Sequence, residues 1–137
     1  KHFINAFGEE LIVENADKSI LEACTQTGAI VSNYTAGPRY IKEGNKGGHE
    51  WVIEFEQAPN DLNKFTDILD KTTREINSDY DAKRQHDLAL TRLVIHDAPR
   101  GTFYKWMASR GKLGAQHKVP RLANSREYLD SVLQFLN

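Results

Sequence analysis

The segment from His49 to Glu56 constrains the fold more than any other part of the chain. Trp51, Ile53 and Phe55 are apolar, whereas glutamates occupy positions 50, 54 and 56. Because successive side chains of a strand point to opposite faces, this alternation predicts a β-strand with one face against a core. The chain must therefore supply helices or strands that cover the apolar face of this strand.

Two long helices are predicted on either side of this strand in the sequence. The first is capped by Asn15 or Asp17 and ends at Gly28, and its apolar positions 20, 21 and 24 recur at helical spacing. The second starts at Pro59 and ends near Asn77, with apolar residues at 62, 65, 68, 69 and 76. Each helix therefore buries one face.

The remaining segments complete the prediction of the fold. We expect a hairpin over residues 3–13, a kinked strand over 29–42, a strand around 88–95 and two closing helices that start near Thr102 and near Asn124 or Ser125. The order is β-α-β-β-α-β plus two C-terminal helices. It predicts an α+β fold with a four-stranded, mainly antiparallel sheet, both long helices on one face and the closing helices on the other.

Residues 79–84 are predicted to be polar and irregular in structure. Tyr80 and Arg84 are interpreted as a local stack or a surface pair.

Composition narrows the classes of function. The 137 residues form one domain, 1–137, with a formal net charge of −1, which indicates neither a nucleic-acid nor a membrane partner. The five histidines are scattered, so no metal site is predicted. The single cysteine, Cys24, is expected to be a buried thiol in a reducing, cytoplasmic setting. Lys1 has no methionine before it, which suggests a piece of a longer polypeptide.

The loop over residues 111–121 is the strongest candidate for a functional site. It contains Lys112, Lys118 and Arg121 and no acidic residue, so an anion such as a phosphate or carboxylate is its natural partner. Pro120 favours an extended backbone before it, which projects Lys118 outward. The alternative is a solvated basic connector between two helices.

Three motifs carry a resemblance to a known family. Residues 114–121, Gly-Ala-Gln-His-Lys-Val-Pro-Arg, resemble the Gly-Gln-aromatic-Lys-x-Pro-Arg pattern near the C-terminus of the acyl-acid amido synthetases, the auxin-responsive family with bacterial relatives. Residues 48–51, Gly-His-Glu-Trp, are similar to that family's Gly-His-Tyr-Val strand, and residues 100–103, Arg-Gly-Thr-Phe, resemble its Lys-Gly-Thr-Phe helix start. The hairpin at residues 3–13 looks like the one that follows the interdomain hinge in the wider adenylate-forming superfamily.

The resemblance implies the C-terminal small, swinging domain of a larger ligase. ATP, Mg²⁺ and a carboxylic acid would be bound mainly by an N-terminal domain that is the natural partner of this chain. The acid and ATP give an acyl-adenylate and pyrophosphate, and an amine such as an amino acid then displaces AMP. The chain is not expected to be active without that N-terminal domain.

The resemblance also implies roles for single residues. Lys118 matches the catalytic lysine of the family, His117 and Arg121 are expected near the nucleotide, and Gly8 is expected near the site in the second step. His117 replaces the usual aromatic residue and Leu122 stands where plant members have Cys, so the acid, the acceptor and even an amide rather than a thioester product stay open. The alternative is a stand-alone α+β module that binds an anion or another protein without catalysis.

Overall fold

The computed structural model describes residues 2–41, 46–87, 89–111 and 118–136. Its strands form two sheets. β1 (Phe3–Ile4) and β2 (Leu11–Ile12) pair antiparallel as a small hairpin. The larger sheet has the strand order β3-β4-β5 and consists of β3 (Ile30–Ile41), β4 (Lys46–Gln57) and β5 (Val94–Ala98). β4 is antiparallel to β3 and parallel to β5.

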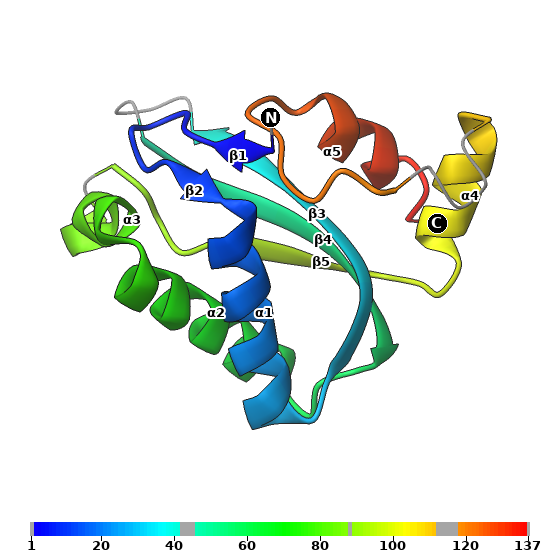
Figure 1. Ribbon diagram of the computed structural model, residues 1–137, viewed down its shortest axis with the longest axis horizontal. Helices are drawn as coiled ribbons and strands as arrows, with labels where there is room; N and C mark the ends of the chain where they lie inside the picture. Colours follow the sequence, from blue (N-terminus) through cyan, green and yellow to red (C-terminus); the bar gives the residue numbers. More distant parts are fainter. Residues whose placement is uncertain (1, 42–45, 88, 112–117, 137) are drawn as a thin grey trace.

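Helices cover both faces of the larger sheet (Figure 1). α1 (Val13–Thr27) and α2 (Leu62–Ile76) pack side by side on one face. α4 (Thr102–Ser109) and α5 (Glu127–Leu133) lie on the other. α3 (Ser78–Arg84) follows α2 and leads into a short 3-10 turn, η1 (Gln85–Asp87). The α+β class and the placement of the closing helices are therefore confirmed.

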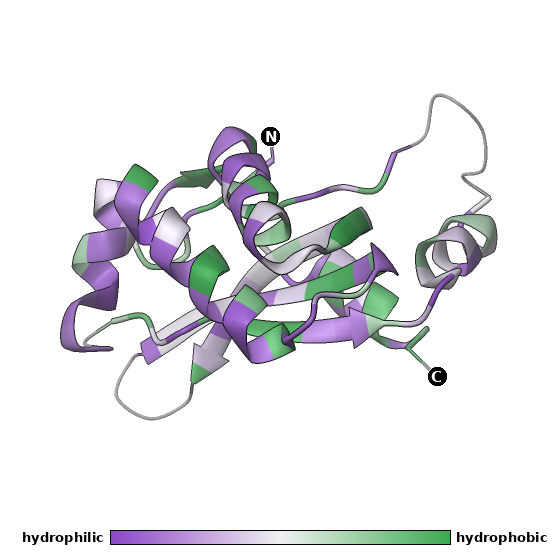
Figure 2. Ribbon diagram, turned by 90° about the horizontal axis from the view of Figure 1, so that it is seen from below, coloured by the Kyte–Doolittle hydropathy of each residue, from purple (hydrophilic) through white to green (hydrophobic). Residues whose placement is uncertain are grey.

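The alternation in β4 divides the interior into two cores. Trp51 and Ile53 belong to the larger core beneath α1 and α2, whereas Val52 belongs to a second core with Phe103 and Trp106 of α4. All five side chains are buried. Hydrophilic and apolar residues form separate patches along the helices in Figure 2, as expected of helices that bury one side only.

The predicted four-stranded sheet does not form, because the first predicted strand does not join the others. The chain turns back at Gly8, where φ is +87°, so β1 and β2 have two residues each and pair with one another. β5 instead pairs directly with β4 after the crossover through α2. The result is a three-stranded sheet beside a separate hairpin.

The predicted ends of α1 and α2 agree with the structure in part. Gly28 ends α1 in the left-handed conformation, with its N–H bonded to the carbonyl of Cys24 at 2.9 Å. The N-cap of α1 is Ile12 rather than Asn15 or Asp17, which both lie inside the helix. Asn15 still takes part in the cap, because its side-chain oxygen accepts from the Ile12 N–H at 3.2 Å. α2 spans the predicted range, and its N-cap is Asp61, which accepts from the Lys64 N–H at 3.2 Å.

Residues 79–84 are not irregular but belong to α3. Asn77 caps this helix, since its side-chain oxygen accepts from the Tyr80 N–H at 2.7 Å. In the part of the chain that the structure describes, no helix is long and apolar enough to cross a membrane.

Candidate functional site

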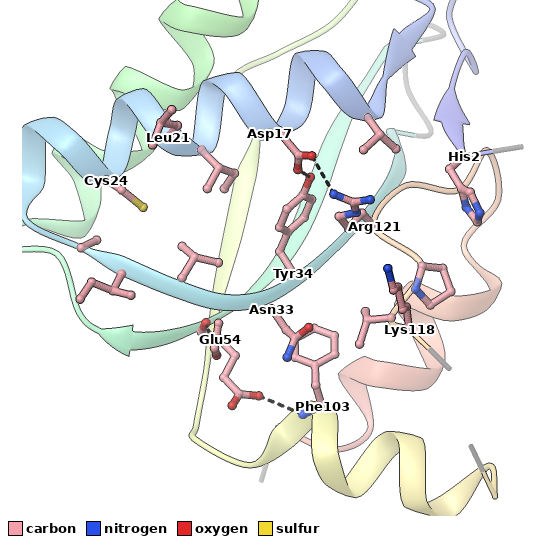
Figure 3. Close-up of a pocket in the computed structure, with 18 of the residues that line it drawn as sticks. His2, Asp17, Leu21, Cys24, Asn33, Tyr34, Glu54, Phe103, Lys118 and Arg121 are labelled. Atoms are coloured by element: carbon pink, nitrogen blue, oxygen red, sulfur yellow. Dashed lines mark hydrogen bonds and ion pairs between the residues drawn. The ribbon is translucent and has the colours of Figure 1, made fainter. Parts of the chain in front are cut away.

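A broad groove of about 1190 Å³ opens beside the outer edge of β3 (Figure 3). Its walls come from α1, the first half of β3, the start of α4 and residues 118–121, the end of the predicted basic loop. The lining residues used below are Asp17, Leu21, Cys24, Tyr34, Glu54, Lys118 and Arg121.

The groove has an apolar end and a cationic end. Leu21 and Cys24 of α1 lie at one end, and Lys118 and Arg121 lie together at the other (Figure 3). Leu21 is 67% exposed, so the apolar end is open to solvent. Burial raises the pKa of the Cys24 thiol, so this half-buried cysteine is a weak nucleophile.

The segment of Lys118, residues 118–123, is fixed to the edge of β3 by its backbone. The hydroxyl of Thr35 donates to the carbonyl of Pro120 at 2.6 Å. The Ala36 N–H donates to the Arg121 carbonyl at 2.8 Å, and the Ala123 N–H donates to the Ala36 carbonyl at 3.2 Å. These bonds form a single parallel bridge between Ala36 and Leu122, both buried. The segment is thus a short structural addition to the sheet rather than a loose connector.

Side chains add a second connection at the same place. The Tyr34 hydroxyl donates to Asp17 Oδ1 at 2.6 Å, and Arg121 Nη1 donates to Asp17 Oδ2 at 2.7 Å (Figure 3). Burial, together with the neighbouring Asp17 carboxylate, raises the pKa of Tyr34 well above its usual range, so its hydroxyl stays a donor. Asp17 therefore links α1 and β3 to the segment of Lys118.

The start of α4 borders the groove and is held by a carboxylate from β4. Glu54 accepts from the Gly101 N–H at 3.1 Å and from the Phe103 N–H at 3.0 Å. These N–H groups have no partner within the helix, so Glu54 completes its first turn. This arrangement fixes α4, and with it the wall of the groove, on the sheet.

Two of the four predicted site residues come together in this groove. Lys118 and Arg121 both line it and both are exposed. Gly8 lies at the turn of the hairpin, outside the groove lining, where an added Cβ would stand 3.3 Å from Lys83 Cε. His117 falls outside the described residues. The structure therefore groups the two cations and separates them from Gly8.

Next to Gly8, a buried ion pair joins the hairpin to the larger sheet. Glu9 Oε2 lies 2.7 Å from His49 Nε2, and neither side chain is more than 1% exposed. Burial by itself raises the pKa of Glu9, but the hydrogen bond and charge of His49 outweigh it and hold that pKa below its ordinary value. Sequence reasoning missed this pair, because 39 residues separate its members and no local pattern joins them.

Tyr80 and Arg84 also lie in a buried polar cluster, and the interpretation of a surface pair was wrong. The Tyr80 hydroxyl donates to Asp70 Oδ1 at 2.5 Å, and Arg84 binds both oxygens of Asp70 at 3.0 and 2.6 Å. All three side chains are buried. The ring of Tyr80 packs on that of His49, with centroids 5.3 Å apart, so the cluster adjoins the Glu9–His49 pair.

Metal-ligating side chains do not gather in the described ranges. No group of three His, Cys, Asp or Glu residues among them could hold a metal ion. His49 and His96 each contact a carboxylate at 2.7 Å instead, that of Glu9 and that of Glu50.

Fold and groove together describe an α+β domain that presents a lysine on a fixed segment beside an open groove. The family profile of the GH3 family C-terminal domain matches residues 14–127, and the chain belongs to this family. The resemblance found in the three motifs is thereby confirmed.

Solved structures agree with the family in their fold. A structure described as GH3.15 acyl acid amido synthetase superposes with a TM-score of 0.76 at 15% identity, over 98% of this chain and 25% of that chain. A second, AtGH3.15 acyl acid amido synthetase in complex with 2,4-DB, gives a TM-score of 0.73 at 17% identity, over 100% of this chain and 26% of that chain. No curated protein matches in sequence. The chain thus spans about a quarter of the length of these structures.

Proposed function

We propose that this chain is the C-terminal domain of an ATP-dependent acyl-acid amido synthetase and that Lys118 acts in formation of the acyl-adenylate. The observation that carries the proposal is the position of Lys118. It is exposed at the cationic end of the groove, and the residues that follow it are bonded to the edge of β3. A cation on a fixed backbone is suited to a reaction in which negative charge is redistributed on phosphorus.

The larger part of such an enzyme would precede this chain. The similar structures are about four times as long, which supports an N-terminal adenylating domain as the partner. That domain would bind the carboxylic acid and ATP. Mg²⁺ would be held there together with the phosphates of ATP, and we assign no step of the metal to the residues of this chain.

In the first step, a carboxylate oxygen of the acid attacks the α-phosphorus of ATP. A new oxygen–phosphorus bond forms, the bond to the β-phosphate bridging oxygen breaks, and pyrophosphate leaves. The Lys118 ammonium would lie between the α-phosphate and the carboxylate, where it reduces their mutual repulsion. Its contribution is larger in the transition state than in the bound substrates, so its loss affects kcat more than binding.

In the second step, the amine nitrogen attacks the acyl carbon, AMP leaves and the amine loses a proton. Gly8 would approach the site in this step. Gly8 lies at the hairpin turn and does not line the groove, so the domain would present a different part of its surface in this step. This separation supports a domain that changes orientation between the two steps.

The test uses the full-length protein and a panel of carboxylic acids. With Lys118→Ala, we expect acid-dependent ATP–pyrophosphate exchange to fall by about 100-fold or more, whereas aminolysis of a supplied acyl-adenylate is spared. Lys105→Ala is the matched control, because Lys105 is exposed on α4 and does not line the groove. Equal loss of both steps contradicts the role of Lys118, and a folded protein that exchanges with no acid favours the non-catalytic module.

A further inference from the structure

We infer that Asp17 is a positioning residue that acts through Arg121 and sets the place of Lys118. This inference rests on the proposed function for its catalytic consequence. Its structural part, the link from Asp17 to the segment of Lys118, rests on the contacts alone.

Among the residues that the structure describes, the backbone anchor of this segment lies after Lys118. The first bond to β3 is made by the carbonyl of Pro120, and the parallel bridge follows at Leu122. A proline has no N–H, so Pro120 cannot donate to the sheet. One residue, Val119, lies between Lys118 and the first of these bonds, so the direction of the segment at Arg121 influences where the lysine stands.

The Arg121 side chain is the contact that can fix this direction. It reaches from the segment across the groove to Asp17 on α1, a residue 104 positions earlier in the chain. Asp17 is itself oriented by the buried hydroxyl of Tyr34, which uses its other oxygen. Because both oxygens of Asp17 are engaged, the guanidinium has one preferred place, and the carboxylate joins a rigid helix and strand to the segment.

The charge of this contact also matters to the cationic end of the groove. Asp17 and Arg121 compensate one another at 2.7 Å. Among the described residues Lys118 forms no salt bridge, so in that part of the segment it is the cation an approaching anion meets uncompensated. Without Asp17, Arg121 is released and competes for the same anion. Asp17 therefore affects both where Lys118 stands and which cation the anion contacts.

The first experiment measures the position of the segment directly. In the full-length protein, amide hydrogen exchange followed by mass spectrometry on a peptide covering residues 119–126 should be about two- to five-fold faster in Asp17→Asn than in the wild type, as expected of an exposed ion pair. The amide to watch is that of Ala123, which donates to the Ala36 carbonyl. Asp67→Asn is the matched control. Asp67 forms an exposed ion pair with Arg92, with an N–O distance of 2.5 Å, and neither residue lines the groove.

The second experiment measures catalysis in the same proteins. Asp17→Asn should lower kcat of ATP–pyrophosphate exchange about ten-fold and change KM for ATP less than three-fold, and Asp17→Glu, which keeps the carboxylate, should recover most of the loss. In a Lys118→Ala background, Asp17→Asn should have no further effect, because a residue that acts through another adds nothing once that residue is gone. Tyr34→Phe removes a single hydroxyl and should give a smaller loss of the same kind.

The outcomes separate this inference from the proposed function. Unchanged exchange of the 119–126 peptide in Asp17→Asn overturns the positioning role. The positioning role is also overturned if Asp17→Asn leaves kcat unchanged although Lys118→Ala is inactive. It is overturned as well if Asp17→Asn lowers kcat as much in the Lys118→Ala background as in the wild type. Full activity of Lys118→Ala overturns the proposed function itself, and the catalytic part of this inference with it, whereas the hydrogen-exchange result still decides the structural link.

Discussion

Two segments that sequence reasoning connected with function, the hairpin around Gly8 and the segment after Lys118, are held to the same sheet by opposite means. The hairpin is attached through the Glu9–His49 pair, which is almost completely buried. The other segment is attached by three backbone-directed bonds and by the Asp17–Arg121 pair, whose side chains are 45% and 48% exposed. The first attachment is a buried ion pair, whereas the second combines a buried backbone bridge with an exposed ion pair.

The difference determines how each segment can respond to change. A buried pair that loses one member leaves an uncompensated polar group, so it behaves as part of the folded core. An exposed pair contributes little to stability and can be broken at small cost. The hairpin is therefore expected to move with the whole domain, whereas the end of the segment at Lys118, before the buried bridge at Leu122, can be adjusted while the fold stays intact.

The largest effect is expected from the buried attachment. Glu9→Ala should lower the free energy of unfolding by about 3 kcal/mol, because His49 is left buried without its partner. Urea unfolding of the variant and the wild type measures this loss. The matched control is Glu75→Ala on the exposed side of α2, for which a change below about 0.5 kcal/mol is expected. A Glu9→Ala loss as small as that of the control would contradict the contrast between the two attachments.

An intermediate effect is expected from Thr35, which anchors the segment from inside the sheet. Thr35→Val should cost about 1 kcal/mol of unfolding free energy, because the Pro120 carbonyl loses its donor. Thr66→Val is a sharp control, since this hydroxyl is also buried but bonds within α2. Both variants should lose similar stability, but only Thr35→Val should speed amide exchange at residues 119–126. Equal protection of that segment in both variants would argue that Thr35 does not hold it.

The smallest effect is expected from acid. The pKa of Glu9 in the folded protein is held below its ordinary value of 4.5. As the pH falls, Glu9 therefore takes up a proton in the unfolded protein before it does so in the folded one. The contribution of Glu9 to the free energy of unfolding is therefore complete above the unfolded pKa of 4.5 and is lost as the pH drops through the pKa of the folded protein. Between pH 5 and pH 4, the wild type should therefore lose up to about 0.7 kcal/mol more stability than Glu9→Gln. Parallel pH profiles of the two proteins in urea unfolding would show that Glu9 is not the acid-sensitive group.

The sequence predicted the elements whose signal is local. The alternation around Trp51 identified β4 and the faces of the sheet, and the 3.6-residue period identified α2 nearly to its ends. Gly28 indicated the end of α1, because the residue that ends this helix takes the left-handed backbone conformation, which favours glycine. Lys118 and Arg121 were picked out because the loop contains cations and no acids, and the structure shows both in one groove.

What the sequence did not predict depends on contacts between distant residues. Asp17 was interpreted as a helix cap, and nothing near it in sequence indicates Arg121 or Tyr34 as its partners. Thr35 looked like an ordinary strand residue, although its hydroxyl holds Pro120. The hairpin over residues 3–13 was predicted and forms, but the fourth strand expected in the larger sheet does not, and no local pattern indicates that the hairpin pairs only with itself.

The bridge between Ala36 and Leu122 has a consequence beyond the placement of a lysine. β3 is an edge strand of twelve residues, and the unpaired N–H and C=O groups of an edge strand can hydrogen-bond to a strand of another molecule. The segment after Pro120 occupies these groups at Ala36, and Pro38 removes one donor from the same edge. Loss of this segment from β3 would therefore create a template for intermolecular strand pairing, so the contacts that serve the groove also protect the protein from aggregation.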